Sequence, residues 1–195
     1  MLAGGSSMAL AGKFSTVVID AGHGGRDNGG SYGKVYEKHL ALDTSFRVNY
    51  LLRKKGYSTK LTRSSDVFIS LSKRAQFSNR YSNSIMVSIH YNWTYKKYIH
   101  GIETFYHGSR SKPLAQYIQT GILKKYRAHN RGVKYARYYV LRHTKNPAVI
   151  VELGFLSNYS ERMRCMKGWY RQKMAEGIVD GIVKYQNARR RGWCN

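Results

Sequence analysis

Cysteine is scarce in this chain, which has only two, Cys165 and Cys194, among its 195 residues. Two cysteines do not build the disulfide framework of a small secreted scaffold, and their spacing from the histidines is not that of a metal site. They could pair with each other outside the cytoplasm and tie the C-terminal tail to the rest of the chain. We favour two unpaired thiols, because a disulfide also needs close and correctly directed Cβ atoms.

Acidic residues are few as well: ten Asp and Glu stand against 34 Lys and Arg, for a formal net charge of +24. A field of this sign concentrates polyanions, so anionic envelope polymers, anionic lipid surfaces and nucleic acid all qualify as partners. The alternative is a basic surface that is simply solvated. We expect no dedicated nucleic-acid partner, because the sequence shows neither a recognition helix nor an aromatic and basic RNP-like strand.

Long apolar runs are also missing. The first twelve residues are small and weakly apolar and lack a charged leading region, which excludes a complete secretory signal and a membrane span. We therefore expect residues 1–13 to be a flexible N-terminal segment, either the remnant of a trimmed signal or a cloning scar. Residues 14–187 form one domain without linkers or repeats, and residues 188–195 form a basic C-terminal tail.

Strand-like and helical patterns alternate along the predicted domain. Gly56 fits a left-handed position after a helix, and Ser70 fits a helix N-cap. This alternation predicts an α/β fold of three layers, a mostly parallel twisted sheet of about six strands with helices on both faces. The expected strands are 16–20, 58–61, 85–89, 102–106, 138–141 and 148–153, and the expected helices are 37–55, 71–83, 113–126 and one that contains 175–182.

Three separated segments, 17–25, 87–92 and 149–155, each begin as an apolar strand and then reach His23, His90 or Glu152. In open α/β sheets the carboxyl ends of the strands face one crevice, so these side chains should converge. Glu37 follows a glycine-rich turn at the start of a helical pattern and can fold back onto the same crevice. Two histidines and one glutamate form a catalytic zinc set with a position left open for water. The remaining glutamate is then available as a base.

Each of these residues also has a plainer interpretation. His23 could simply occupy a glycine turn, and Glu37 could be an acid favoured by the helix dipole. His90 and Glu152 are harder to explain in this way, because an unpartnered imidazole or carboxylate in a buried strand is costly. Taken together, the four residues favour a shared site.

The chain resembles the zinc-dependent N-acetylmuramoyl-L-alanine amidases of the type 3 family, enzymes that cut peptidoglycan. The resemblance runs from about Val17 to about Tyr185. It rests on ordered blocks: Asp20-Ala-Gly-His-Gly-Gly25, Glu37-Lys38, Leu61-Thr-Arg63, Ser70-Leu71 with Arg74, Ser88-Ile-His90, Gly101-Ile-Glu-Thr104, Arg131-Gly-Val-Lys134 and Pro147 to Asn158.

The resemblance implies that residues 14–187 are an amidase catalytic domain that binds one Zn²⁺ per chain. His23, Glu37 and His90 would be the zinc ligands, and Glu152 the catalytic carboxylate. The bond cut would join N-acetylmuramic acid to L-alanine of the stem peptide, in peptidoglycan or in muropeptides. This substrate implies a location in the cell envelope, periplasmic or secreted. Substrate contacts are assigned to Asn92 and to Arg131, which lies in a basic turn.

Two other functions are weighed against this one. The first is a noncatalytic basic module that binds the cell wall, for which the Glu152 carboxylate would have no use. The second is a serine peptidase activity, because Ser70-Leu-Ser-Lys73 matches the S-x-x-K pattern, although it equally fits a helix N-cap followed by an exposed lysine.

The sequence also bears on regulation. In some members of the family a long inserted helix blocks the cleft until a partner protein removes it. Here only residues 91–100 separate His90 from Gly101, which is too short for an inhibitory helix and its two connections. We therefore predict that no activator protein is obligatory.

Overall fold

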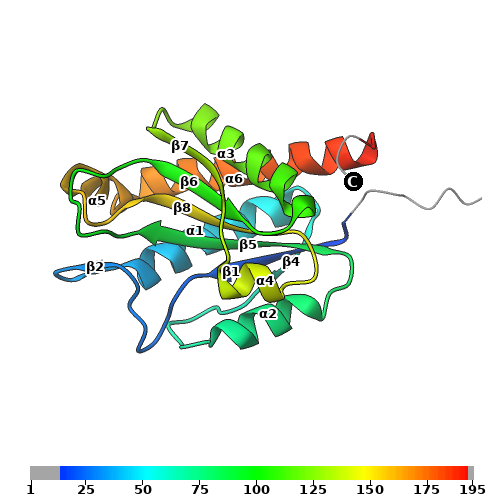
Figure 1. Cartoon of the computed structure of the whole chain (residues 1–195), viewed down its shortest axis with the longest axis horizontal. Helices are drawn as coiled ribbons and strands as arrows, with labels where there is room; N and C mark the ends of the chain where they lie inside the picture. Colours follow the sequence, from blue (N-terminus) through cyan, green and yellow to red (C-terminus); the bar gives the residue numbers. More distant parts are fainter. Residues whose placement is uncertain (1–13, 193–195) are drawn as a thin grey trace, which may run out of the picture.

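The central sheet of the molecule has six strands in the order β4-β1-β5-β8-β6-β7. Figure 1 shows these strands lying one beside the next, with β7 toward the top of the view. The computed structural model describes residues 14–192. Strand β6 runs antiparallel to β8, whereas all other neighbouring strands are parallel. The strands are β1 (Thr16–Ala21), β4 (Ser58–Leu61), β5 (Ser84–Asn92), β6 (Ile102–Tyr106), β7 (Asn130–Tyr135) and β8 (Ala148–Phe155), and β2 (Ser31–Tyr32) and β3 (Val35–Tyr36) form a separate hairpin.

Helices cover both faces of this sheet, which confirms the predicted three-layer α/β fold. One face carries α1 (Glu37–Lys54), α3 (Lys112–Lys125) and α6 (Gly168–Arg190) over the larger apolar core. The other face carries α2 (Leu71–Asn79) and α4 (Tyr139–His143) over a smaller core that includes Val18, Met86 and Ile150. Helix α5 (Tyr159–Cys165) follows β8 at the end of the sheet where β1, β5 and β8 finish.

The sequence patterns located most of these elements. Helix α1 ends at Lys54 and is followed by Gly56 with φ of 79°, as a left-handed residue after a helix requires. The hydroxyl of Ser70 accepts a hydrogen bond from the backbone amide of Lys73, so Ser70 is the N-cap of α2. This helix ends at Asn79, earlier than the predicted residue 83.

Two segments differ from the expectation. The predicted strand at 138–141 is not a strand: Tyr138 is the N-cap of helix α4, and residues 139–141 begin that helix. Val140 and Leu141 both pack into the small core, and the Tyr139 and His143 rings stack one helical turn apart, with centroids 3.9 Å apart. The predicted basic turn at 131–134 is the edge strand β7, paired with β6. A half-solvated edge strand needs few apolar residues, so its sequence carries a weak signal.

The chain ends and the cysteines complete the comparison. Helix α6 continues to Arg190 with Ala188 buried, so the predicted tail at 188–195 begins as helix rather than as a separate segment. Cys165 is a buried free thiol, whereas Cys194 and the predicted N-terminal segment at 1–13 lie outside the described residues. No helix within residues 14–192 is both long enough and apolar enough to cross a membrane.

Candidate functional site

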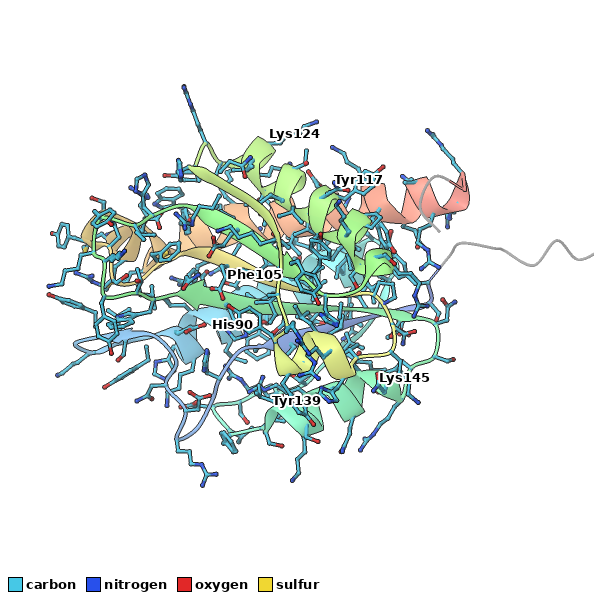
Figure 2. The ribbon with its side chains drawn as sticks, in the orientation of Figure 1. His90, Phe105, Tyr117, Lys124, Tyr139 and Lys145 are labelled. Atoms are coloured by element: carbon cyan, nitrogen blue, oxygen red, sulfur yellow. The ribbon has the colours of Figure 1, made fainter. Side chains whose placement is uncertain are left out.

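The site forms on the sheet face that α2 and α4 cover, where the strand residues change from apolar to polar. Side chains alternate between the two faces of a strand, so Val18 and Asp20 on β1 share this face. Cross-strand pairing sets Asp20 beside Ser88, and His90 beside Glu152. Strands β5 and β8 continue beyond His90 and Glu152, which therefore lie inside the strands near their carboxyl ends and not at the ends themselves. Figure 2 shows His90 toward the end of β5.

His23, Glu37 and His90 converge at this place, as the sequence predicts. One potential ligand atom from each of them lies within 4.8 Å of the others. Oε1 of Glu37 is 3.1 Å from Nε2 of His23 and 2.8 Å from Nδ1 of His90. Two imidazole nitrogens and a carboxylate oxygen around one point are donors that suit a divalent transition metal, so this triad is a possible metal site.

The backbone around the triad is closely packed. A Cβ atom added at Gly22 would lie 2.4 Å from Cε1 of His90, so only glycine leaves room for that imidazole. His23 itself has φ of 58°, in the left-handed region that non-glycine residues rarely occupy. Such a conformation costs about 1–3 kcal/mol and persists only where surrounding contacts impose it.

Two buried arginines supply those contacts. The Arg74 guanidinium donates to the carbonyls of Ala21 and His23, both at 2.6 Å, and forms a 2.7 Å ion pair with Asp20. Arg63 donates to the carbonyls of Ala21 and Gly22 at 3.0 and 2.8 Å. The two guanidiniums thus hold the backbone that carries His23. Burial would raise the pKa of Asp20, but the charge of Arg74 and three side-chain hydrogen bonds outweigh it and lower that pKa.

The orientation of His23 is set by Asp27. Its Oδ2 atom lies 2.9 Å from Nδ1 of His23, and an ionised carboxylate only accepts, so Nδ1 carries the hydrogen. Nε2 of the same ring lies 3.1 Å from Oε1 of Glu37. Carboxylates commonly orient metal-binding histidines in this way. Asp27 was not identified from the sequence, where it reads only as a polar residue in a glycine-rich loop.

Glu37 is buried at the centre of the triad. The backbone amides of Gly30 and Tyr91 donate to its two oxygens at 2.7 and 3.0 Å. Burial would raise the pKa of this carboxyl, but the hydrogen bonds to His23 and His90 and their charges outweigh it and lower the pKa to about 2. Glu37 is therefore a permanent anion that favours a cation at this place.

Glu152 differs from Glu37 because no hydrogen bond or positive charge offsets the effect of burial on its carboxyl pKa. Its side chain is buried, and its Oε2 atom has no hydrogen-bond partner in the described part of the chain. Burial raises the pKa of Glu152 well above its ordinary value, and the charges of Glu37 and Glu103 raise it further. A buried carboxyl without partners is costly and is usually found where it serves chemistry.

Glu103 is the acid that sequence reasoning missed. It lies on β6 directly opposite Glu152, and Arg131 and Lys134 of β7 neutralise it at 2.8 and 2.5 Å. Asn92 donates to its other oxygen at 2.8 Å. The two predicted substrate-binding residues, Asn92 and Arg131, therefore meet on Glu103. The only sequence signal for this cluster was a glutamate within an apolar strand.

A cleft of about 360 Å³ opens beside Glu152, between α2 and α4. Ser70 lines this cleft, but its hydroxyl caps α2, and Lys73 is exposed, which favours the helix-cap interpretation of the S-x-x-K match. Tyr139, marked on α4 in Figure 2, contributes to the apolar wall. The lining residues are Asp20, His23, Asp27, Phe68, Ile69, Ser70, Leu71, Arg74, Ser88, His90, Tyr138, Tyr139, Val140, Ile150 and Glu152.

Comparison with known proteins agrees with this geometry. Residues 17–184 match the family described as N-acetylmuramoyl-L-alanine amidase. The chain is 36% identical over 174 residues to the N-acetylmuramoyl-L-alanine amidase LytC of Bacillus subtilis, a match that covers 87% of this chain and 35% of LytC. The chain thus spans about a third of the length of that relative.

Solved structures extend the comparison. The crystal structure of an N-acetylmuramoyl-L-alanine amidase from Clostridium difficile 630 superposes with a TM-score of 0.86 and 36% identity, over 91% of this chain and 98% of the other. The CwlD amidase from Clostridioides difficile, solved in complex with the GerS lipoprotein, gives a TM-score of 0.85 at 29% identity, over 89% and 99% of the two chains. With the family match across nearly the whole described domain, these likenesses place the chain in the N-acetylmuramoyl-L-alanine amidase family.

Proposed function

We propose that this chain is a zinc-dependent N-acetylmuramoyl-L-alanine amidase, which hydrolyses the amide between the lactyl group of N-acetylmuramic acid and L-alanine of the stem peptide. One observation carries the proposal: the ligand atoms of His23, Glu37 and His90 lie within 4.8 Å of one another, next to a buried carboxyl, Glu152, whose Oε2 lacks a partner among residues 14–192. Two imidazoles and one carboxylate, with a position left open, are a catalytic zinc set.

Each side chain has a role in this reaction. When bound by the triad, Zn²⁺ supplies Lewis acidity and lowers the pKa of water. Asp27 keeps His23 in the tautomer that presents Nε2 to the site. The Glu152 carboxylate would take the proton of the attacking water and then deliver it to the leaving nitrogen of L-alanine. Burial raises the pKa of Glu152, which increases the proton affinity that a general base needs.

The substrate contacts of Arg131 and Asn92 are part of the proposal. Their bonds to Glu103 fix both side chains next to the strand that carries Glu152. The Arg131 guanidinium also lies 5.1 Å from the centre of the Phe155 ring. From this place Arg131 would attract a carboxylate of the stem peptide, as a partly exposed cation at the rim of the site.

The envelope is the expected location, since peptidoglycan is the substrate. The net charge of +24 would draw the protein to anionic envelope polymers, with an attraction that salt screens. The CwlD amidase was solved in complex with the GerS lipoprotein, so one relative binds a protein partner. In this chain the connection between β5 and β6 holds no helix, which supports activity without an activator protein.

A noncatalytic wall-binding module is the alternative. Such a module would gain nothing from a buried Glu152 whose Oε2 has no partner among residues 14–192, beside three potential metal ligands. The cost of burying that carboxyl therefore favours an enzyme.

The test combines metal analysis with mass spectrometry of peptidoglycan digested by the purified protein. We expect about one zinc per chain and products with a free L-alanine amino group. Glu152→Gln should retain the zinc and lose hydrolysis, whereas Glu176→Gln, on the far helix α6, should keep both. Binding to the wall without any cleavage by the wild-type protein would instead support the noncatalytic module.

A further inference from the structure

Exposed aromatic side chains gather at the end of the molecule where β1, β5 and β8 finish. Four of them form what we call the aromatic platform: Tyr32 in β2, Trp93 and Tyr95 in the connection after β5, and Tyr159 at the start of α5. Their exposed fractions are 49%, 38%, 88% and 68%. Figure 1 shows β2 and α5 close to this end of the sheet. Large exposed aromatic residues that cluster in this way mark a binding surface.

The platform is held in place by Arg162. The guanidinium carbon of this residue lies 3.7 Å from the centre of the Tyr32 ring and 5.5 Å from that of Tyr159. Arg162 is itself only 6% exposed and donates to the carbonyl of Leu156 at 2.8 Å. The two rings are therefore oriented before any ligand arrives, which reduces the entropy lost on binding.

The platform has two halves, Tyr32 with Tyr159 and Trp93 with Tyr95, and contacts between their segments join them into one surface. The amide of Thr94 donates to the Ser157 hydroxyl at 3.2 Å, and the Asn158 side chain donates to the carbonyl of Lys97 at 2.9 Å. The rings of Trp93 and Tyr95 pack edge to face with centroids 4.7 Å apart. A hollow of about 250 Å³ lies beside Tyr32 and Tyr159 and reaches Lys97 of the connection after β5; it is lined by Tyr32, Lys97, Ser157, Asn158, Tyr159, Ser160 and Arg162.

The platform is continuous with the metal triad. A Cβ atom at Gly30 would lie 2.8 Å from Cβ of Trp93, so the chain at Gly30 packs directly against that tryptophan. The amide of Gly30 donates to Oε2 of Glu37 at 2.7 Å. Gly30 thus contacts both Trp93 of the platform and the predicted metal ligand Glu37.

We infer that the aromatic platform binds the glycan strand of peptidoglycan next to the muramic acid whose amide is cut, an inference that rests on the proposed function. A pyranose ring has an apolar C–H face that packs on aromatic rings, while its hydroxyl and N-acetyl groups bond to polar side chains at the rim. Lys97 and Ser160, which are exposed and line the hollow, provide such groups. The glycan continues beyond the cut unit, so it needs an open surface, and the four exposed rings provide one.

The observations favour a glycan over an anionic polymer at this surface. Arg162 is buried between two rings and a carbonyl, so it offers little charge to a ligand. Lys97 is the one other cation that lines the hollow. The surface therefore presents ring faces, whereas the positive charge of the protein is spread over the whole chain.

The binding test uses the Glu152→Gln background, so that wall samples that still carry stem peptides are not cut during the measurement. We expect Tyr95→Ala combined with Tyr159→Ala to bind purified glycan strands, freed of stem peptides, about tenfold more weakly, and to do so equally at low and high salt. Tyr50→Ala is the matched control, since Tyr50 is 59% exposed but lies on α1. Unchanged glycan binding would overturn the inference. So would a loss seen only on walls that retain anionic polymers and only at low salt, which would assign the surface to those polymers.

The activity test separates this inference from the proposed function. With Glu152 intact, the double variant should cut whole sacculi several-fold more slowly than the wild type but cut a soluble N-acetylmuramoyl-peptide with a single sugar at the wild-type rate. An equal loss on both substrates would mean that the rings support the active site and not the glycan. If the wild type cuts neither substrate, the proposed function fails, and the glycan-binding measurement still decides the role of the platform.

Discussion

The replacement of Arg74 by methionine tests how the fold supports the site. Arg74 is 3% exposed and donates to four acceptors: Asp20, Ala21, Ile69 and His23. Methionine keeps an apolar stem of similar length but removes every one of these bonds. The Asp20 carboxylate then stays buried without its cation, and the removal of one partner from a buried ion pair costs about 3–5 kcal/mol.

This loss should be visible in urea unfolding of the metal-free protein. With an m-value of about 2 kcal/mol/M, the midpoint of Arg74→Met should fall by about 2 M. Lys73→Met, an exposed neighbour on the same helix, should change it little. Arg74→Met combined with Asp20→Asn should recover part of the loss, because the second change removes the uncompensated charge.

Arg74→Met should also weaken zinc binding, because Arg74 bonds to the carbonyl of His23 and so holds the backbone of that residue in its left-handed conformation. Groups that orient metal ligands are typically worth about 10–100-fold in affinity, which chelator competition measures. A variant that loses stability but keeps wild-type zinc affinity would refute the positioning role. A midpoint within about 0.3 M of the wild type would refute the energetic argument as well.

The remaining predictions concern the metal, the acid and base, and pH. Chelation of the metal should abolish hydrolysis and leave the far-UV circular dichroism largely unchanged, because a core of this size folds without a metal; unfolding at room temperature would make the site structural. Glu152→Gln should keep zinc and slow hydrolysis by about 10²–10⁴-fold, whereas His90→Ala should lose zinc; loss of zinc from Glu152→Gln would make Glu152 a ligand. The lowered pKa of Asp20 stabilises the fold above its ordinary pKa of about 3.9, and this contribution disappears as the pH falls through the folded-state pKa. The difference in unfolding free energy between the wild type and Asp20→Asn should therefore be constant from pH 7 to pH 5 and shrink below pH 4; a constant difference down to pH 2 would contradict the assignment.

The local pattern of residues determined most of the secondary structure and the residues of the triad. Some features depend only on residues close together in the sequence: the apolar strand runs, the N-cap at Ser70 and the left-handed Gly56 after α1. The strand predicted at 138–141 was wrong, because an apolar run of four residues fits a strand or a helix turn equally well. Its packing against α2 decided for the helix.

What surrounds the triad was decided by tertiary structure alone. Glu103 faces Glu152 only because β6 inserts antiparallel beside β8, and sequence spacing does not predict that pairing. The carbonyls held by Arg63 and Arg74, and the contact of Trp93 with Gly30, likewise join segments that are distant in the chain. Residue types and their spacing thus determined which groups do the chemistry. Strand order and direction decided which groups support them, because burial and long-range contacts exist only once the sheet has formed.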